Sequence, residues 1–89
     1  MADVSAAGDD PDRLLAGVLE IVRQVLEQPE LSADDDFIVS GGDSFRMVLL
    51  VRALEERYQV TVDPGLAFDA PTAREMSKWV AAQALEEGR

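Results

Sequence analysis

Apolar residues recur at intervals of three and four in three stretches of the chain, and prolines stand between these stretches. This spacing places the apolar side chains on one face of an α-helix, which turns once every ~3.6 residues. The sequence therefore predicts helices over residues 11–27 and 44–58 and a last helix that begins after Thr72. Pro29 and Pro71 lie outside these helices, as expected for a residue that lacks a backbone N–H.

Each expected helix follows a residue suited to capping. Asp10 precedes Pro11 at the first helix, Asp43 precedes the second, and Thr72 precedes the last. Short polar side chains there accept hydrogen bonds from unpaired N–H groups of the first turn, and proline is tolerated at the first helical position. Each expected helix has an apolar face that we assign to the core. In the first helix it consists of Leu15, Val18, Leu19, Val22, Val25 and Leu26, widened by Leu14 and Ile21; in the second, of Met47, Leu50, Val51, Leu54 and Tyr58; and in the last, of Ala73, Met76, Val80 and Leu85. We expect Met76 and Trp79 to pack in the core rather than to line a ligand pocket.

The two segments that connect the three expected main helices differ in length and in residue content. Residues 28–43 exceed the roughly 2–8 residues usual between packed helices, and we expect Leu31, Phe37 and Ile38 to fold back onto the core. Residues 63–68 predict one short helical turn, with Phe68 as its buried anchor. The expected fold class is all-α: a four-helix bundle with three main helices, one short helix and a long first loop.

Composition limits the chemistry. The 89 residues suffice for one domain, placed at residues 11–87 after a disordered leader over residues 1–10. A net charge of −10 argues against binding to nucleic acid or an anionic membrane, and no apolar run or signal peptide indicates export. Without His or Cys, the chain lacks the usual catalytic bases, thiols and thiolate metal sites, and the acidic run 34–36 lacks calcium-site spacing. We expect a cytoplasmic protein that is not an enzyme and binds no metal.

One motif is more specific than these exclusions. The residues Gly41-Gly42-Asp43-Ser44, at the start of the second helix, resemble the phosphopantetheine attachment motif of carrier proteins, and most closely that of peptidyl carrier proteins of nonribosomal peptide synthesis. Residues 50–54 resemble the body of that family's second helix, and residues 68–72 resemble the Phe-x-x-Pro-Thr segment before its last helix. The resemblance covers roughly residues 12–85.

The resemblance implies a carrier that tethers an amino acid or acyl intermediate as a thioester on a 4'-phosphopantetheine arm. A phosphopantetheinyl transferase would attach this arm from coenzyme A to Ser44, with Asp43 and Gly42 at the same site. An adenylation or ligase enzyme would load the arm, and condensation or tailoring enzymes would act next. Because the chain is one domain with its own Met1, we expect a free-standing carrier. We also expect it to be a monomer. The alternatives are an acyl carrier protein of a polyketide pathway and a non-catalytic helical interaction domain.

Physical reasoning about the second helix supports the same site. A serine in the first helical turn lies where the helix dipole and backbone N–H groups favour a phosphate. Phe45, Val48 and Leu49 fall off the expected core face beside Ser44 and are bordered by Arg46 and Arg52. We therefore predict that Phe45, Arg46, Val48 and Leu49 form a partner-docking patch. The identity of the cargo is not encoded in any motif that we recognise.

Overall fold

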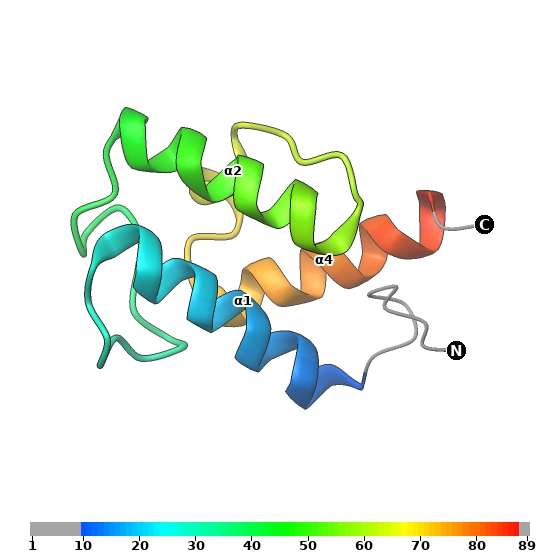
Figure 1. The fold of residues 1–89 in the computed structure, drawn as a ribbon, viewed down its shortest axis with the longest axis horizontal. Helices are drawn as coiled ribbons and strands as arrows, with labels where there is room; N and C mark the ends of the chain where they lie inside the picture. Colours follow the sequence, from blue (N-terminus) through cyan, green and yellow to red (C-terminus); the bar gives the residue numbers. More distant parts are fainter. Residues whose placement is uncertain (1–9, 88–89) are drawn as a thin grey trace.

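A computed structural model of the chain describes residues 10–87 and confirms the all-α prediction within them (Figure 1). The helices are α1 (Pro11–Leu26), α2 (Ser44–Tyr58), α3 (Leu66–Asp69) and α4 (Ala73–Glu87). The expected disordered leader lies outside the described residues, apart from Asp10. No helix in the described part is long and apolar enough to cross a membrane.

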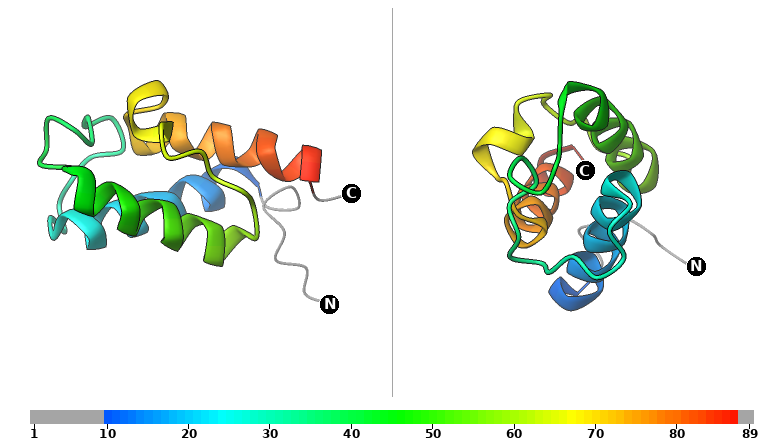
Figure 2. Two further views of the ribbon diagram at one scale, coloured as in Figure 1. Left: turned by 90° about the horizontal axis from the view of Figure 1, so that it is seen from above. Right: turned by 90° about the vertical axis from the view of Figure 1, so that its left-hand side faces the viewer.

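The three long helices surround one core, and α1 and α2 run in opposite directions (Figures 1 and 2). The loop between α1 and α2 closes the end of the bundle where α2 begins, and α3 lies to one side of the long helices. Segment 60–62 leads back toward that end without pairing as a strand (Figure 1). The start of α2 is therefore flanked by the long loop and α3.

Capping residues fix the helix boundaries as the sequence predicts. Asp10 and Asp43 accept hydrogen bonds from the N–H groups three residues later, at 2.8 and 2.9 Å, and Thr72 does the same for α4 at 3.1 Å. At the other ends of α1 and α2, Glu27 and Gln59 adopt left-handed backbone angles and donate to carbonyls of the last turn. The helix ends are satisfied locally, which leaves packing to decide the arrangement of the helices.

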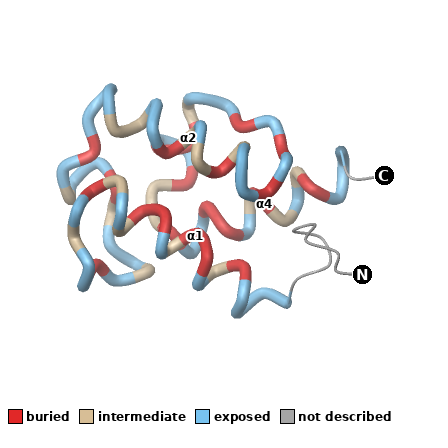
Figure 3. Tube along the Cα trace, in the orientation of Figure 1, coloured by how far each residue is buried: buried red, intermediate tan, exposed pale blue. Residues whose placement is uncertain are grey.

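The core runs along the inward faces of α1, α2 and α4 (Figure 3). Leu14 and Ile21, expected only to widen the face of α1, are central to it, whereas Leu15 and Leu19 are half-buried. On α2, Leu50, Leu54 and Tyr58 are buried, but Met47 and Val51 are only half-buried. Buried residues of the first connection include Leu31 and Phe37.

Two smaller core predictions are wrong. Ile38 is exposed, because Phe37 takes the inward position and the chain then turns outward. Leu85 is exposed as well, because the buried line of α4 continues through Val80 to Ala84, and the next residue is rotated by about 100°. Trp79 packs against the core while half-buried, in agreement with its expected packing role.

The prediction that Phe68 anchors α3 is also wrong. Its side chain is 67% exposed, and the short helix is held instead by Leu66 and Ala67, which are almost fully buried. A four-residue helix has one inward face, and these two adjacent residues occupy it. Phe68 therefore lies on the side of α3 that faces outward, with consequences for the site described next.

Candidate functional site

Ser44 is the first residue of α2 and is exposed to solvent. The preceding residue, Asp43, caps the helix: its carboxylate accepts the N–H of Arg46 at 2.9 Å, and its carbonyl accepts the N–H of Met47 at 2.8 Å. The N–H groups of the first turn point along the helix axis toward its start. Together with the helix dipole, they make this exposed hydroxyl a favourable place for an attached anion.

The two glycines before Asp43 serve different purposes. Gly41 has a φ angle of 117°, in a region that side chains disfavour. Gly42 is buried, and its N–H donates to the carbonyl of Phe37 at 2.8 Å. A methyl group on Gly42 would overlap the Phe37 ring. Gly41 therefore allows the chain to turn, and Gly42 allows it to pack against the buried Phe37 just before α2 begins.

The loop that leads to Ser44, residues 27–43 (the first connection), is tied to α1 and to the start of α4. Near α1, the side chain of Arg23 donates to the Leu31 carbonyl at 2.8 Å, and that of Gln28 donates to the Ser40 carbonyl at 2.6 Å. On the other side, the N–H of Phe37 donates to the Pro71 carbonyl at 2.7 Å.

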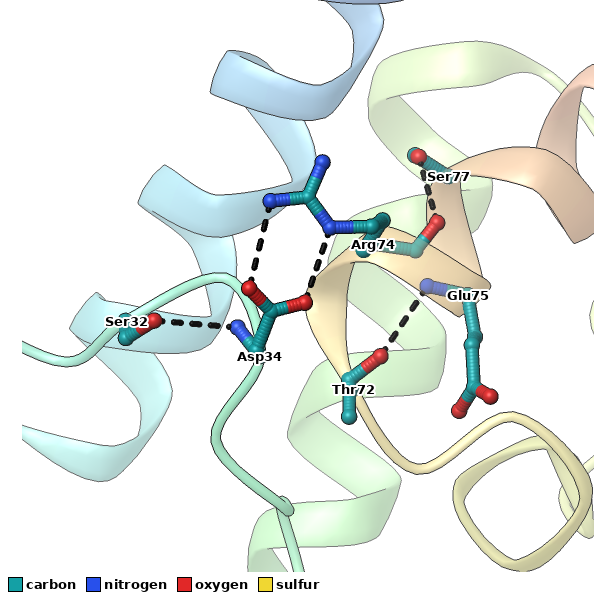
Figure 4. A network of polar contacts seen from close by, with 6 residues as sticks. All are labelled: Ser32, Asp34, Thr72, Arg74, Glu75 and Ser77. Carbon is teal, nitrogen blue, oxygen red and sulfur yellow. Dashed lines mark hydrogen bonds and ion pairs between the residues drawn. The ribbon is translucent and has the colours of Figure 1, made fainter.

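Figure 4 shows the strongest polar tie between this connection and α4. The Arg74 guanidinium donates twice to the Asp34 carboxylate, with distances of 2.8 and 3.3 Å, and the Arg74 N–H donates to the Ala33 carbonyl at 3.1 Å. The hydrogen bonds from Arg74 hold the pKa of Asp34 below its ordinary value. Asp34, the first residue of the acidic run 34–36, therefore makes a structural contact. Among the described residues, no group of side chains is arranged to hold a metal ion.

An apolar groove of about 390 Å³ begins at Ser44 and runs along α2. We call it the Ser44 groove. One wall consists of residues from α2, and the other of residues from the segment between α2 and the end of α3. The lining residues are Ser44, Met47, Val48, Val51 and Arg52 on the first wall and Pro64 and Phe68 on the second.

This groove was not predicted from the sequence. One available signal was the spacing of four residues from Ser44 to Val48 and from Val48 to Arg52, which places all three along one side of a helix. The other wall had no such signal, because the sequence predicts Phe68 to be a core residue. Its exposure is what turns α3 into a wall of the groove.

The residues of the predicted docking patch have different surroundings in the structure. Phe45, Val48 and Leu49 are 69%, 54% and 39% exposed, in agreement with their expected place off the core face. Val48 lines the Ser44 groove, whereas Phe45 and Leu49 lie outside it. Arg46 is turned toward α1, where its Nε donates to the Val25 carbonyl at 3.3 Å and a guanidinium nitrogen lies 3.9 Å from a Glu27 carboxylate oxygen.

Comparison with known proteins identifies the family. Residues 16–80 match the family model described as a phosphopantetheine attachment site. The chain is 31% identical over 65 residues to tyrocidine synthase 3 of Brevibacillus parabrevis and 36% identical over 64 residues to the dapdiamide synthesis protein DdaD of Enterobacter agglomerans. These alignments cover 73% and 72% of this chain but 1% and 11% of those longer proteins.

The fold has a counterpart among solved structures. A free-standing peptidyl carrier protein from an uncharacterized Acinetobacter baumannii secondary metabolic pathway superimposes with a TM-score of 0.74 at 20% identity, covering 82% of this chain and 94% of that one. The chain therefore belongs to the phosphopantetheine-attachment family of carrier domains, as the motif indicated. Members of this family carry 4'-phosphopantetheine covalently and are not themselves catalytic.

Proposed function

We propose that this protein is a peptidyl or aminoacyl carrier of a nonribosomal peptide pathway and that Ser44 bears its 4'-phosphopantetheine arm. The observation that carries the proposal is the position of Ser44: an exposed hydroxyl on the first residue of α2, within the segment that matches the attachment family. The relatives that resemble this chain include tyrocidine synthase 3 and pyochelin synthetase PchF, which supports the peptidyl rather than the polyketide class.

The residues around Ser44 suit a phosphodiester. Asp43 holds the start of α2 through its bond to the Arg46 N–H, and the N–H groups of the first turn face the position of an attached phosphate. Gly42 and Phe37 fix the preceding chain, so the hydroxyl is presented from a defined backbone. When bound, phosphopantetheine supplies a terminal thiol that carries the cargo as a thioester. This chain supplies the attachment atom and the surface around it.

The proposal includes partner enzymes. A phosphopantetheinyl transferase modifies Ser44, a cytoplasmic adenylation or ligase enzyme loads the arm, and condensation or tailoring enzymes use the cargo. We assign their docking to the exposed patch of Phe45, Val48 and Leu49 with Arg46 at its border. Leu49→Asp should slow loading or transfer by at least one partner without changing the thermal melting curve. If the rates with every partner are unchanged, Leu49 does not belong to the docking patch.

Intact-mass spectrometry tests the attachment site. After incubation with coenzyme A and a promiscuous transferase, the wild-type protein should gain the mass of one phosphopantetheine, whereas Ser44→Ala should gain none. Ser40→Ala is a matched control, because it removes a hydroxyl from the same loop four residues earlier and should be modified like the wild type. Circular dichroism should show that both variants remain folded. Modification of Ser44→Ala would refute the assignment.

A further inference from the structure

The Ser44 groove has the size and character of a small-molecule site. Its volume of about 390 Å³ falls within the roughly 300–1,000 Å³ typical of ligand pockets, and apolar side chains make most of its surface. Two of its exposed apolar side chains, Val48 and Phe68, come from opposite walls. Large apolar side chains left in solvent beside a reactive position indicate that something covers them for part of the time.

The position of the groove suits a ligand tethered at Ser44. Ser44 lines one end, and Arg52 lies eight residues further along the same helix, which corresponds to about 12 Å at 1.5 Å per residue. A group attached at Ser44 is held near the groove at an effective concentration on the order of millimolar. Even a weak contact is then populated, so the shallow groove needs little intrinsic affinity.

Arg52 distinguishes this groove from a plain apolar surface. Three other arginines have acidic partners: Arg46 lies near Glu27, Arg57 pairs with Glu20 at 3.1 Å, and Arg74 pairs with Asp34. The guanidinium of Arg13 has no acidic partner among the described residues either, but Arg13 lies outside the groove. The Arg52 guanidinium makes no ion pair or hydrogen bond with any residue in the described part of the chain, and it is the one cationic group that lines the groove. In a protein of net charge −10, a cation kept there without a partner favours an anionic ligand.

We propose that Arg52, in the wall of the Ser44 groove, recognises a free carboxylate on the cargo of the arm. The cargo class is an acyl or aminoacyl group with an apolar stem, which Val48 and Phe68 contact, and a free carboxylate in addition to the carbonyl used in the thioester. This inference rests on the proposed attachment at Ser44. Arg52 is a specificity residue for the cargo, and the guanidinium can bind a carboxylate through two parallel hydrogen bonds.

Two matched cargoes test the proposal. The apo protein is converted with pantetheine analogues that carry either a pentanoyl or a 4-carboxybutanoyl group through a stable amide, so that the two loaded forms differ by one terminal carboxylate. Methyl and aromatic NMR spectra are then compared for Val48, Val51 and Phe68. The carboxylate form should shift these signals more than the pentanoyl form, and added salt should reduce the difference.

A chemical readout gives the size of the effect. With the corresponding thioesters, each rate of cleavage by hydroxylamine is divided by the rate for the same thioester on free pantetheine, since the two cargoes differ in intrinsic reactivity. This normalised rate should be about two- to fivefold lower for the carboxylate-bearing cargo than for the neutral one, the range given by an exposed ion pair. Arg52→Gln should make the two normalised rates equal. Lys78→Gln, a cation-removing change on the exposed side of α4, should keep the difference.

The outcomes separate the inference from the proposed function. If intact mass shows no loading at Ser44, the proposed function itself is refuted. If loading is normal but the two cargoes give equal shifts and equal normalised cleavage rates, the cargo does not contact Arg52. If Arg52→Gln affects only transfer by a partner enzyme, the guanidinium binds a carboxylate of that enzyme, and the inference about the cargo is wrong.

Discussion

The first connection, residues 27–43, and the second connection, residues 59–72, lie on either side of α2 and are held in different ways. In the first, the Arg23 side chain ties the chain to α1 and Arg74 ties it to α4, while the bond from Gln28 to the Ser40 carbonyl lies within the connection and Phe37 fills the core. Its sequence is polar and rich in small residues, yet its path is set by tertiary contacts.

The second connection depends more on buried apolar side chains. Val60, Val62, Leu66 and Ala67 are buried, while α3 has no side-chain cap. Two carboxylates hold its first residues: Glu87 accepts the Thr61 N–H at 3.1 Å, and Glu55 accepts the Val62 N–H at 3.0 Å. Within α3 and the turn before it, the Gly65 N–H donates to the nearby Asp63 carboxylate at 2.9 Å, which is a local contact.

This difference matches what each connection contributes to the site. The first connection ends directly before Ser44, so its anchors fix the position of the proposed attachment serine. The second connection supplies Pro64 and Phe68, which form the far wall of the Ser44 groove. A wall held by apolar contacts and exposing an aromatic ring can adjust to cargoes of different shape at little cost, because apolar contacts have no directional requirement.

The largest expected effect comes from the aromatic residues of the two connections. Phe37→Ala should lower the free energy of unfolding by about 3–5 kcal/mol, because the ring is fully buried. Phe68→Ala is the matched control and should change it by about 0.5 kcal/mol or less, because the ring is mostly exposed. Urea melts of both variants give the comparison. Similar losses in the two variants would contradict the distinction between the connections.

Glycine substitutions sharpen the comparison. Gly42→Ala should cost about 1–3 kcal/mol, because the new methyl group would overlap the Phe37 ring and lie 2.8 Å from its carbonyl oxygen. Gly65→Ala should be neutral or stabilising by up to about 1 kcal/mol, because its φ of −79° suits alanine and the new methyl group would lie 3.6 Å from an Asp63 carboxylate oxygen. Thermal and urea unfolding check both values. A well-tolerated Gly42→Ala would show that the first connection can shift.

The smallest expected effect concerns pH. Hydrogen bonds from Arg74 lower the pKa of Asp34 from its ordinary 3.8, and those from Gln83 and then Thr61 lower the pKa of Glu87 from its ordinary 4.5. A carboxylate with a lowered folded-state pKa stabilises the fold above its unfolded pKa and loses that contribution as the pH falls through the folded value. Each contribution is therefore complete at neutral pH and small, since both groups are exposed.

Urea melts across acidic pH distinguish the two carboxylates. The stability difference between wild type and Glu87→Gln should begin to shrink as the pH falls below about 4.5, and that between wild type and Asp34→Asn only below about 3.8. The second connection should thus lose its carboxylate contact over a higher pH range than the first. A difference that grows on acidification would have the wrong sign for both contacts.

Much of the fold could be predicted from local patterns. Capping by Asp10, Asp43 and Thr72 needs only residues three positions apart, and all three caps form as expected. Helical spacing found the core of α2 but misjudged its edges, since Met47 and Val51 are only half-buried. Spacing tells which residues share a face, and the neighbouring elements decide how much of that face is covered.

The candidate site, too, could be predicted from the sequence only in part. The motif at residues 41–44 placed Ser44 at a helix start, and the family match agrees with it. No sequence pattern indicated that Arg46 turns toward the end of α1 or that Phe68 faces the solvent and lines the groove together with Val48. Both depend on which way a side chain of a neighbouring element points, and no local pattern encodes that.

By itself, the sequence determined the helices, their caps, the small size of the core and the serine that the family motif marks. Only the tertiary structure decided that Leu66 and Ala67, rather than Phe68, hold α3, and that α3 therefore forms a groove with α2. The physical reason is the range of the interactions. Capping and helical spacing act within a few residues of the chain, whereas a groove exists only where two elements distant in sequence pack with their exposed side chains facing one space.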